Sequence, residues 1–273
     1  MGNHERLDPE IAGHYGSVSE QERLGTWNLE RVRTWELLGR YLPSSPAVVL
    51  DVGGAAGVYA LPLAAAGYEV HLVDPLALHV DQAFRGSERQ PATPLASATV
   101  GDARRLDWAD ASVDVVLLLG PLYHLTDQGD RIGALAEARR VLRPDGVLVA
   151  AAISRFASTV DGLLRGYLDE PAFEAMVERV LRDGQHRNPT GRPEWFTTAY
   201  FHLPEELGQE VTEAGLRRTA VLAVEGPAWV LPDIQDRLAD PARRERVLAA
   251  IRRVETEPSL LGVSSHLLAV ATR

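Results

Sequence analysis

Residues 48–57 read VVLDVGGAAG, an apolar run that leads into an aspartate and then into a stretch of small residues. This order is typical of a β-strand that ends in a turn beside a nucleotide or a related cofactor. Small residues let a ligand approach the backbone closely, and an acid at the start of the turn suits a cationic ligand group. A tight strand-to-helix turn without a ligand is the alternative interpretation of this stretch alone.

The loop departs from both familiar phosphate-binding patterns. Counted from Gly53, the G-x-G-x-x-G code of dinucleotide folds meets Ala55 and Val58 where glycines are needed, and a start at Gly54 also fails. A P-loop requires Lys, and this chain has none because all 28 basic residues are Arg. The loop therefore favours a cofactor that presents no phosphate to it.

Two further acids follow at the ends of the next two apolar runs. Asp74 closes EVHLVD, about 20 residues beyond the loop, where a carboxylate can accept hydrogen bonds from ribose hydroxyls. Asp102 lies in VGDA, where it can accept the exocyclic amine of adenine. Because the carboxyl ends of parallel strands meet at one edge of a sheet, we expect Asp51, Asp74 and Asp102 to face one ligand.

Apolar runs alternate with helical patterns along most of the chain, which predicts a parallel sheet with right-handed crossovers. A helix is expected at 17–42, with a capping box of Ser19 and Glu22. The expected strands of this part are 47–52, 69–74, 96–102, 112–120 and 147–153, and the expected helices are 58–67, 75–86 and 129–142.

The alternation stops near residue 154, which predicts an insertion at 154–203. This stretch contains two helical patterns, at 157–169 and 171–183, and then a polar segment with aromatic residues. The alternation resumes with the expected helices 204–214 and 239–254 and the expected strands 219–226 and 266–272.

Together these stretches resemble the class I S-adenosylmethionine-dependent methyltransferases. The similarity runs over about residues 47–153, through VVLDVGGAAG, HLVDP, VGDARRLDWADASVDVVLLLGPLYHL and EARRVLRPDGVLVAAAI, and HLLAVATR resembles the last strand of the family. The resemblance implies a Rossmann-like three-layer α/β sandwich with a mostly parallel seven-stranded sheet and an antiparallel last strand. It implies one domain over 1–273, with an N-terminal helical lid at 1–45 and a helical cap insertion at 154–203.

The resemblance also assigns cofactor contacts. The loop of Asp51, Gly53 and Gly57 would hold the methionine part of S-adenosylmethionine, and Ala55 replaces the second Gly of the family pattern D/E-x-G-x-G-x-G. The other implied contacts are Asp74 to the ribose, Pro75 beside the adenine, Asp102 and Ala103 at the adenine edge, Leu119 and Gly120 beneath the cofactor, Tyr15 over the sulfonium and Arg23 at the carboxylate.

Acceptor-side candidates come from three segments. GPLYHL places Tyr123 and His124 after the fourth strand, where they could contact the acceptor or, for His124, serve as a general base. Packing or turn capping is the alternative for both. The insertion offers His186, Tyr200 and His202 to a substrate pocket, or these residues belong to its own small core. Trp229 beyond the sixth strand is a further candidate.

Composition limits the partners. The net charge of −10 disfavours nucleic acid, and without Cys the chain can form neither disulfides nor zinc–thiolate sites. Because no H-x-x-x-H or H-E-x-x-H spacing occurs, we expect no metal. The charged start of the chain is no signal peptide, and no apolar run approaches a membrane span, so a cytoplasmic protein with no membrane partner is expected. The sequence leaves the oligomeric state open.

The expected activity is methyl transfer from S-adenosylmethionine to an O, N or C atom of a small molecule, with S-adenosylhomocysteine as the product, and the expected context is secondary metabolism. Two alternatives stay open: a peptide or protein methyltransferase, and a non-catalytic protein that binds the same cofactor. An NAD-dependent oxidoreductase is disfavoured because G-x-G-x-x-G is absent.

Overall fold

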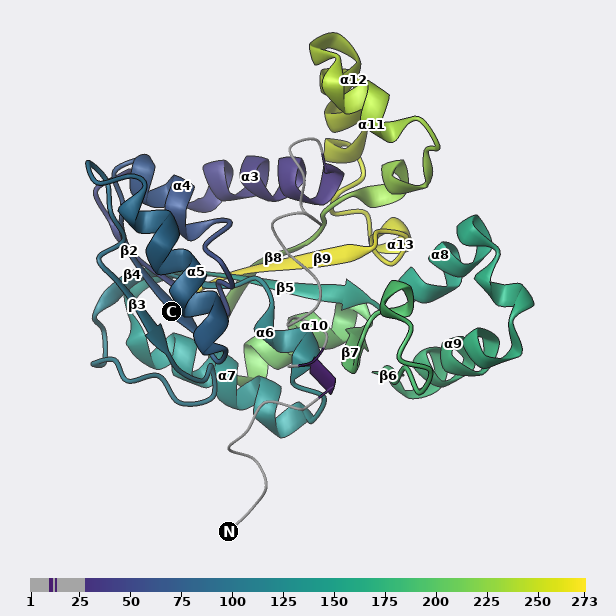
Figure 1. Ribbon diagram of the computed structural model, residues 1–273, viewed down its shortest axis with the longest axis horizontal. Coiled ribbons are helices and arrows are strands. Elements are labelled where there is room, and N and C mark those ends of the chain that lie inside the picture. The colour runs from purple at the N-terminus through teal and green to yellow at the C-terminus, as the bar shows by residue number, and fades with distance from the viewer. Residues whose placement is uncertain (1–9, 12, 14–27) are drawn as a thin grey trace.

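The computed structural model describes residues 10, 11, 13 and 28–273, and its centre is a twisted sheet (Figure 1). Seven core strands lie in the order β3-β2-β1-β4-β5-β9-β8. The pairs among β3, β2, β1, β4 and β5 are parallel, whereas β9 runs antiparallel to β5 and β8. The expected seven-stranded sheet is confirmed. The core strands are β1 (Val48–Val52), β2 (Glu69–Asp74), β3 (Ser97–Val100), β4 (Val113–Leu118), β5 (Leu142–Ser154), β8 (Arg217–Ala223) and β9 (His266–Thr272).

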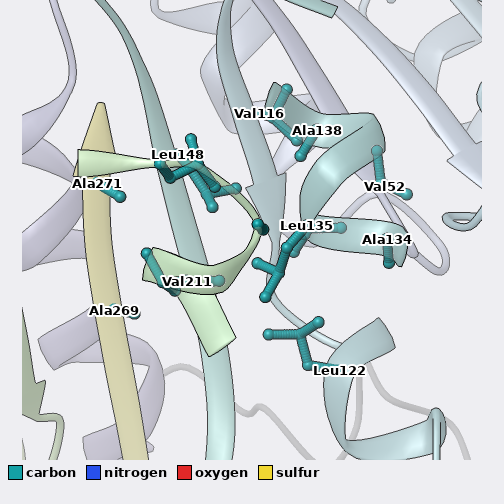
Figure 2. Packing of buried hydrophobic residues seen from close by; sticks show 14 of the residues in the cluster. Val52, Val116, Leu122, Ala134, Leu135, Ala138, Leu148, Val211, Ala269 and Ala271 are labelled. Carbon is teal, nitrogen blue, oxygen red and sulfur yellow. The ribbon is translucent and has the colours of Figure 1, made fainter. Parts of the chain in front are cut away.

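Helices cover both faces of this sheet, as the three-layer prediction requires (Figure 1). One face carries α3 (Leu29–Tyr41), α4 (Ala60–Ala65) and α5 (Ala77–Glu88), and the other carries α7 (Gln128–Val141) and α10 (Pro204–Glu213). Successive strand residues alternate between the two faces. On β4, for example, Val116 packs in one apolar cluster and Leu117 in the other, and Figure 2 shows the α7 side.

Helix boundaries follow local capping chemistry. The described part of the predicted helix 17–42 begins at Leu29, after the side chain of Asn28 accepts a hydrogen bond from the amide of Arg31. Residues 14–27, with the predicted capping box, lie outside the described residues. The predicted helix 239–254 is confirmed as α12 (Pro241–Arg252), two residues shorter at each end, because Asp240 caps it and a proline lies in its first turn. The separate helix before it, α11 (Ile234–Ala239), was not predicted. The short helices α13 (Pro258–Leu261) and α6 (Pro121–His124) were not predicted.

Residues 154–203, which we call the cap segment, project from one end of the sheet (Figure 1). The predicted helices are confirmed there, although the first ends early, at a left-handed Gly166. A small aromatic core around Phe173 and Trp195 holds the segment together. Its elements are α8 (Ala157–Arg165), the 3₁₀ turns Tyr167–Asp169 and Pro193–Trp195, α9 (Pro171–Asp183), β6 (Gln185–His186) and β7 (Ala199–His202).

The cap segment also joins the central sheet. β7 pairs in parallel with the last residues of β5, since Ile153 lies opposite Phe201 and Ser154 opposite His202. Ile153 pairs on its other side with His266 of β9, so β7 occupies the β4 side of β5. The pairing of β4 with β5 ends earlier, at Leu118 and Ala150. β7 therefore extends the sheet beyond the carboxyl end of β4.

Within the described part of the chain, no helix combines the length and the apolar character that crossing a membrane would require.

Candidate active site

A cavity of about 650 Å³ opens at the carboxyl ends of the parallel strands. This is the edge at which open α/β sheets bind their ligands. The loops after β1, β2 and β3 form one part of its wall, α6 forms another, and β5 and β9 contribute a third. The sequence-predicted residues that line it are Asp51, Gly53, Ala55, Asp74, Pro75, Asp102, Ala103, Leu119, Gly120, Tyr123 and His124.

The small-residue loop after β1 is held against its neighbours by backbone geometry. Gly53 has a φ of 70°, and its amide donates to the carbonyl of Val73 at 2.7 Å. A Cβ at Gly53 would lie 2.6 Å from the Pro121 side chain, so only glycine fits between β1 and α6. Gly57, with a φ of 85°, packs near Leu61 and is not among the described residues that line the cavity.

Ala55 adopts a left-handed conformation, with a φ of 46°. Such a backbone favours glycine, which the family pattern has here. The amide of Ala55 donates to Oδ2 of Asp74 at 2.9 Å and thereby ties the loop to the end of β2. The replacement therefore adds backbone strain as well as one methyl group.

Asp51 is the buried acid at the start of the loop. Its residue is 1 % exposed, it lines the cavity, and its Oδ2 has no hydrogen-bond partner among the described residues. Burial, followed by the negative charge of Asp74, raises the pKa of the Asp51 carboxyl to about 7. An unpaired buried carboxylate oxygen at a cavity wall suits a cationic ligand group such as an ammonium.

Asp74 is held by three protein donors. Its Oδ2 accepts from the amide of Ala55, and its Oδ1 accepts from the amide of Leu76 at 2.9 Å and contacts Nδ1 of His79 at 2.9 Å. His79 itself is buried, lines the cavity and was not predicted from the sequence. These contacts fix the orientation of the carboxylate, whose further lone pairs can accept from a ligand hydroxyl.

Asp102 accepts more hydrogen bonds from the protein itself than its sequence position indicates. Arg104 donates to Oδ1 through its backbone amide at 2.8 Å and to Oδ2 through its guanidinium at 2.6 Å, and it also reaches Asp130 at 2.9 Å. Burial opposes ionisation, but these hydrogen bonds prevail and lower the pKa of Asp102. Arg104 and Asp130 line the cavity beside it.

The short helix α6 brings the two predicted acceptor-side residues to the cavity. The rings of Tyr123 and His124 lie 4.7 Å apart, edge to face, and Phe196 of the cap segment lies within 6.4 Å of both centroids. Nδ1 of His124 is 3.4 Å from the carbonyl oxygen of Thr198. The side chain of Thr198 also donates to Glu10, whose neighbour Ile11 lines the cavity. The cap segment and the described N-terminal residues therefore meet at α6.

The other predicted substrate residues lie elsewhere, and none of the four is among the described residues that line this cavity. His186 bonds the carbonyl of Trp195 at 2.8 Å, and burial lowers its pKa to about 4. His202 and Tyr200 pack around an ion pair described below. The indole of Trp229 donates to the carbonyl of Val263 at 2.8 Å. Tyr15 and Arg23 lie outside the described residues.

Sequence reasoning missed one wall of the cavity. Three apolar side chains there, Ala151, Val224 and Leu268, belong to the α3 side of the core. Glu30, Thr34 and His266 add polar groups to the same lining. Their positions in the sequence give little signal, because they come together only when α3, β5, β8 and β9 assemble.

The protein has a Rossmann-like α/β fold with a cavity at the carboxyl ends of its parallel strands. A family profile described as "Methyltransferase domain" matches residues 49–146. The chain is 32 % identical to the ubiquinone/menaquinone biosynthesis C-methyltransferase UbiE of Acidiphilium cryptum strain JF-5 over 214 residues. This alignment covers 77 % of this chain and 78 % of that protein. The chain belongs to the class I S-adenosylmethionine-dependent methyltransferases.

Solved structures agree on the fold. A methyltransferase from Methanosarcina mazei superposes with a TM-score of 0.59 at 19 % identity, over 87 % of this chain and 96 % of that one. A second methyltransferase, from Mesorhizobium loti, superposes with a TM-score of 0.58 at 15 % identity, over 90 % of this chain and 100 % of that one. The similarity in sequence to the relative from Acidiphilium cryptum identifies the protein as a methyltransferase that uses S-adenosylmethionine and releases S-adenosylhomocysteine, which excludes an NAD-dependent oxidoreductase.

Proposed function

We propose that this methyltransferase modifies a small-molecule acceptor bound in the cavity beside the cofactor. The observation that carries this proposal is that one cavity contains both the row of acids at the strand ends and the apolar wall of β5, β8 and β9. Its volume of about 650 Å³ lies within the range of small-molecule and cofactor sites.

The cofactor would lie along the acidic side. Asp51 would pair with its amino group, since Oδ2 is buried without a partner among the described residues. Asp74 would accept from the ribose, and Asp102 with Ala103 would meet the adenine edge, where the hydrogen bonds from Arg104 compete for the carboxylate. The remaining proposed contacts are Gly53 and Ala55 in the loop, Gly57 at its turn, Pro75 beside the adenine, and Leu119 with Gly120 beneath.

S-adenosylmethionine supplies an activated methyl group together with its own leaving group. The protein is left with positioning and with exclusion of water. Tyr123 and His124 would contact the acceptor from α6, and Ala151, Val224 and Leu268 would shield it from solvent. His186, Tyr200, His202 and Trp229 would then support the site indirectly, through the cap segment and its surroundings.

The apolar wall favours an acceptor with an uncharged ring or chain. The relative from Acidiphilium cryptum is named as a C-methyltransferase of ubiquinone and menaquinone biosynthesis. That name supports testing carbon methylation of a quinone-type ring first, and methylation of oxygen and nitrogen acceptors afterwards.

The segments around the site would complete the enclosure. Ile11 lines the cavity, and Glu10 accepts a hydrogen bond from Thr198 of the cap segment. These contacts support an N-terminal lid within residues 1–45 that meets the cap segment, inside a single domain of 1–273. Tyr15 and Arg23 would belong to that lid.

Isotopic labelling tests the proposal. The enzyme is incubated with methyl-labelled S-adenosylmethionine and a metabolite extract, and mass spectrometry locates the label. We expect a labelled small molecule, which is lost in Asp74→Ala and retained in Asp161→Asn, where a partly exposed acid of α8 that pairs with Arg165 is changed. Label found solely in the protein fraction would refute the small-molecule assignment and favour a peptide or protein acceptor.

A further inference from the structure

The start of β9 brings a further histidine to the cavity, His266, which lies apart from the residues of α6. Antiparallel pairing of β8 with β9 brings the end of one strand beside the start of the other, and the amide of Val224 donates to the carbonyl of His266 at 3.1 Å. Glu225 follows directly and lies against His266. The imidazole of His266 lines the cavity next to Val224 and Leu268.

Glu225 is a buried carboxylate with fixed partners. Its residue is 3 % exposed. Oε1 lies 2.6 Å from Nδ1 of His266, and Oε2 accepts from the hydroxyl of Ser264 and from the amide of His266, each at 2.9 Å. Three contacts on two oxygens hold the carboxylate in one orientation, and the carboxylate in turn orients the imidazole ring.

This contact determines the tautomer of the ring. A carboxylate accepts only, so the proton of neutral His266 resides on Nδ1 and the lone pair resides on Nε2. Glu30 of α3 also lines the cavity, with Oε2 at 4.0 Å from Nδ1. Two carboxylates therefore lie close to a ring that would become positively charged on accepting a proton, and both stabilise that charge.

We propose that His266 is the general base of this methyltransferase, that Glu225 is its positioning residue, and that the acceptor is one that must lose a proton when methylated. The inference rests on the proposed small-molecule function and narrows it to hydroxyl groups and to ring carbons activated by a hydroxyl. Nε2 takes the proton of the acceptor as the new bond to the methyl carbon forms. The methyl–sulfur bond breaks, and its electron pair stays on the sulfur.

Among the described histidines, His79 also lines the cavity with Nδ1 against a carboxylate, Asp74 at 2.9 Å, but Asp74 lies on the acidic side of the cavity, where it is the proposed ribose contact. Nδ1 of His124 contacts a backbone carbonyl at 3.4 Å, which is a longer contact and one with a neutral group. His71 forms a similar pair with Glu69, but at 3.3 Å, with an exposed carboxylate, and it is not among the described residues lining the cavity. The pair of His71 and Glu69 therefore provides a matched control for the pair of His266 and Glu225.

The same three side chains could instead be considered as ligands of a metal ion, since ligand atoms of Glu30, Glu225 and His266 lie within 4.8 Å of one another. The 2.6 Å between Nδ1 and Oε1 favours a shared proton, because two ligands about 2.1 Å from one ion would be spaced more widely. A metal is consequently an outcome that the experiment must separate from the proposal.

The first measurement needs no acceptor. The ring nitrogens of His266 are observed by ¹⁵N NMR in the full-length enzyme bound to S-adenosylhomocysteine, with His266→Gln used to assign the signals. We expect protonated Nδ1 and unprotonated Nε2 above the titration range of the ring, and a changed Nδ1 signal in Glu225→Gln. Protonation on Nε2 instead of Nδ1 would overturn the proposal.

The second measurement is transfer of labelled methyl groups into the metabolite extract. We expect His266→Gln to lower the rate by at least about 100-fold and Glu225→Gln by a smaller factor, both with unchanged affinity for S-adenosylhomocysteine, while His71→Gln keeps the wild-type rate. In the wild-type enzyme the rate should rise with pH as His266 loses its proton, and this rise should be absent in His266→Gln. An unchanged rate in that variant, or a rate abolished by EDTA and restored by Mg²⁺, would overturn the assignment.

These results also separate the two proposals. If the wild-type enzyme binds S-adenosylhomocysteine but labels no small molecule, the proposed acceptor class fails. The NMR measurement on the same sample still tests whether Glu225 holds His266 in the tautomer that a base requires.

Discussion

Asp51 and Asp74 lie at the ends of neighbouring parallel strands, where burial and then the negative charge of Asp74 raise the pKa of the Asp51 carboxyl to about 7. The amide of Ala60 donates to the Asp51 carboxylate and only partly offsets this effect. The cavity thus presents one carboxylate with protein donors on both oxygens and one whose Oδ2 has no partner among the described residues. We therefore expect cofactor binding in this cavity to depend on pH.

The first prediction concerns stability without cofactor. The pKa of Asp51 is higher in the folded protein than the value of about 4 in an unfolded chain, so the folded state binds the proton more tightly. The free energy of unfolding therefore falls as pH rises from about 4 to about 7, by at most about 4 kcal/mol from this group. Asp51→Asn should lack this loss and gain stability relative to wild type between pH 5 and pH 8. Denaturant unfolding at both pH values measures it, and identical pH dependence would contradict it.

A second prediction follows for ligand binding at pH 7. If the amino group of S-adenosylhomocysteine pairs with Asp51, binding favours the carboxylate and releases about half a proton, because the group is half-protonated at its pKa. Calorimetry in buffers of different ionisation enthalpy detects this release. We expect it to vanish in Asp51→Asn and at pH 9, where the carboxylate is already ionised. Equal release by both proteins would assign the proton to another group.

The third prediction addresses the ribose contact. Asp74→Ala removes the acceptor for the loop amide of Ala55 and the proposed acceptor for the ribose. The affinity for S-adenosylhomocysteine should fall by about 10- to 100-fold, as expected for lost hydrogen bonds to a charged group. Asp161→Asn on α8 serves as the control. Unchanged affinity in Asp74→Ala would remove Asp74 from the cofactor site.

A fourth prediction tests the strained loop position. Ala55 has a φ of 46°, a conformation that costs a non-glycine residue about 1–2 kcal/mol. Ala55→Gly should therefore raise the free energy of unfolding by about 1 kcal/mol, after the greater chain entropy of glycine is counted. Affinity for S-adenosylhomocysteine should stay equal or improve. Destabilisation of the variant would show that the methyl group of Ala55 packs favourably and outweighs the strain.

The last prediction concerns a buried ion pair behind the cap segment. Arg131 of α7 donates to both oxygens of Glu210 of α10, at distances down to 2.6 Å, and Nε2 of His202 contacts the same carboxylate at 3.1 Å. The guanidinium lies 3.7 Å from the ring centroid of Tyr200. Burial opposes charge on Glu210, but its hydrogen bonds with His202 and Arg131 lower its pKa.

Removing one charge from this pair leaves the other buried without compensation. Glu210→Gln should lower the free energy of unfolding by about 3–5 kcal/mol, measured by denaturant titration. Glu194→Gln, which breaks an exposed pair with Arg192, should change stability little. Comparable effects in the two variants would mean that burial of the Arg131–Glu210 pair is unimportant.

The strands and most helices could be predicted because their apolar periodicity is local. β6 and β7 could not, because they have two and four residues and form through pairing with each other and with the end of β5. The acids at the strand ends were predictable for a related reason: the topology alone places the carboxyl ends of parallel strands together.

Other site residues needed the assembled fold. Glu225 and His266 are about 40 positions apart, and the antiparallel pairing of β8 with β9 brings them into contact. In the cap segment, aromatic composition indicated a pocket, but composition does not determine which way a ring points. His186 instead stacks on Phe201 at 4.8 Å, and its role in substrate binding stays a prediction.

The pairing of β7 with β5 limits how the enzyme can admit its substrate. A hinged cover would have to break the backbone pairing of Phe201 and His202 with the central sheet each time it opened. The end of the cap segment is therefore fixed to the sheet. Because none of its residues is among the described residues that line the cavity, sequence changes in this segment should affect acceptor choice indirectly, through the contacts of Phe196 and Thr198 with α6.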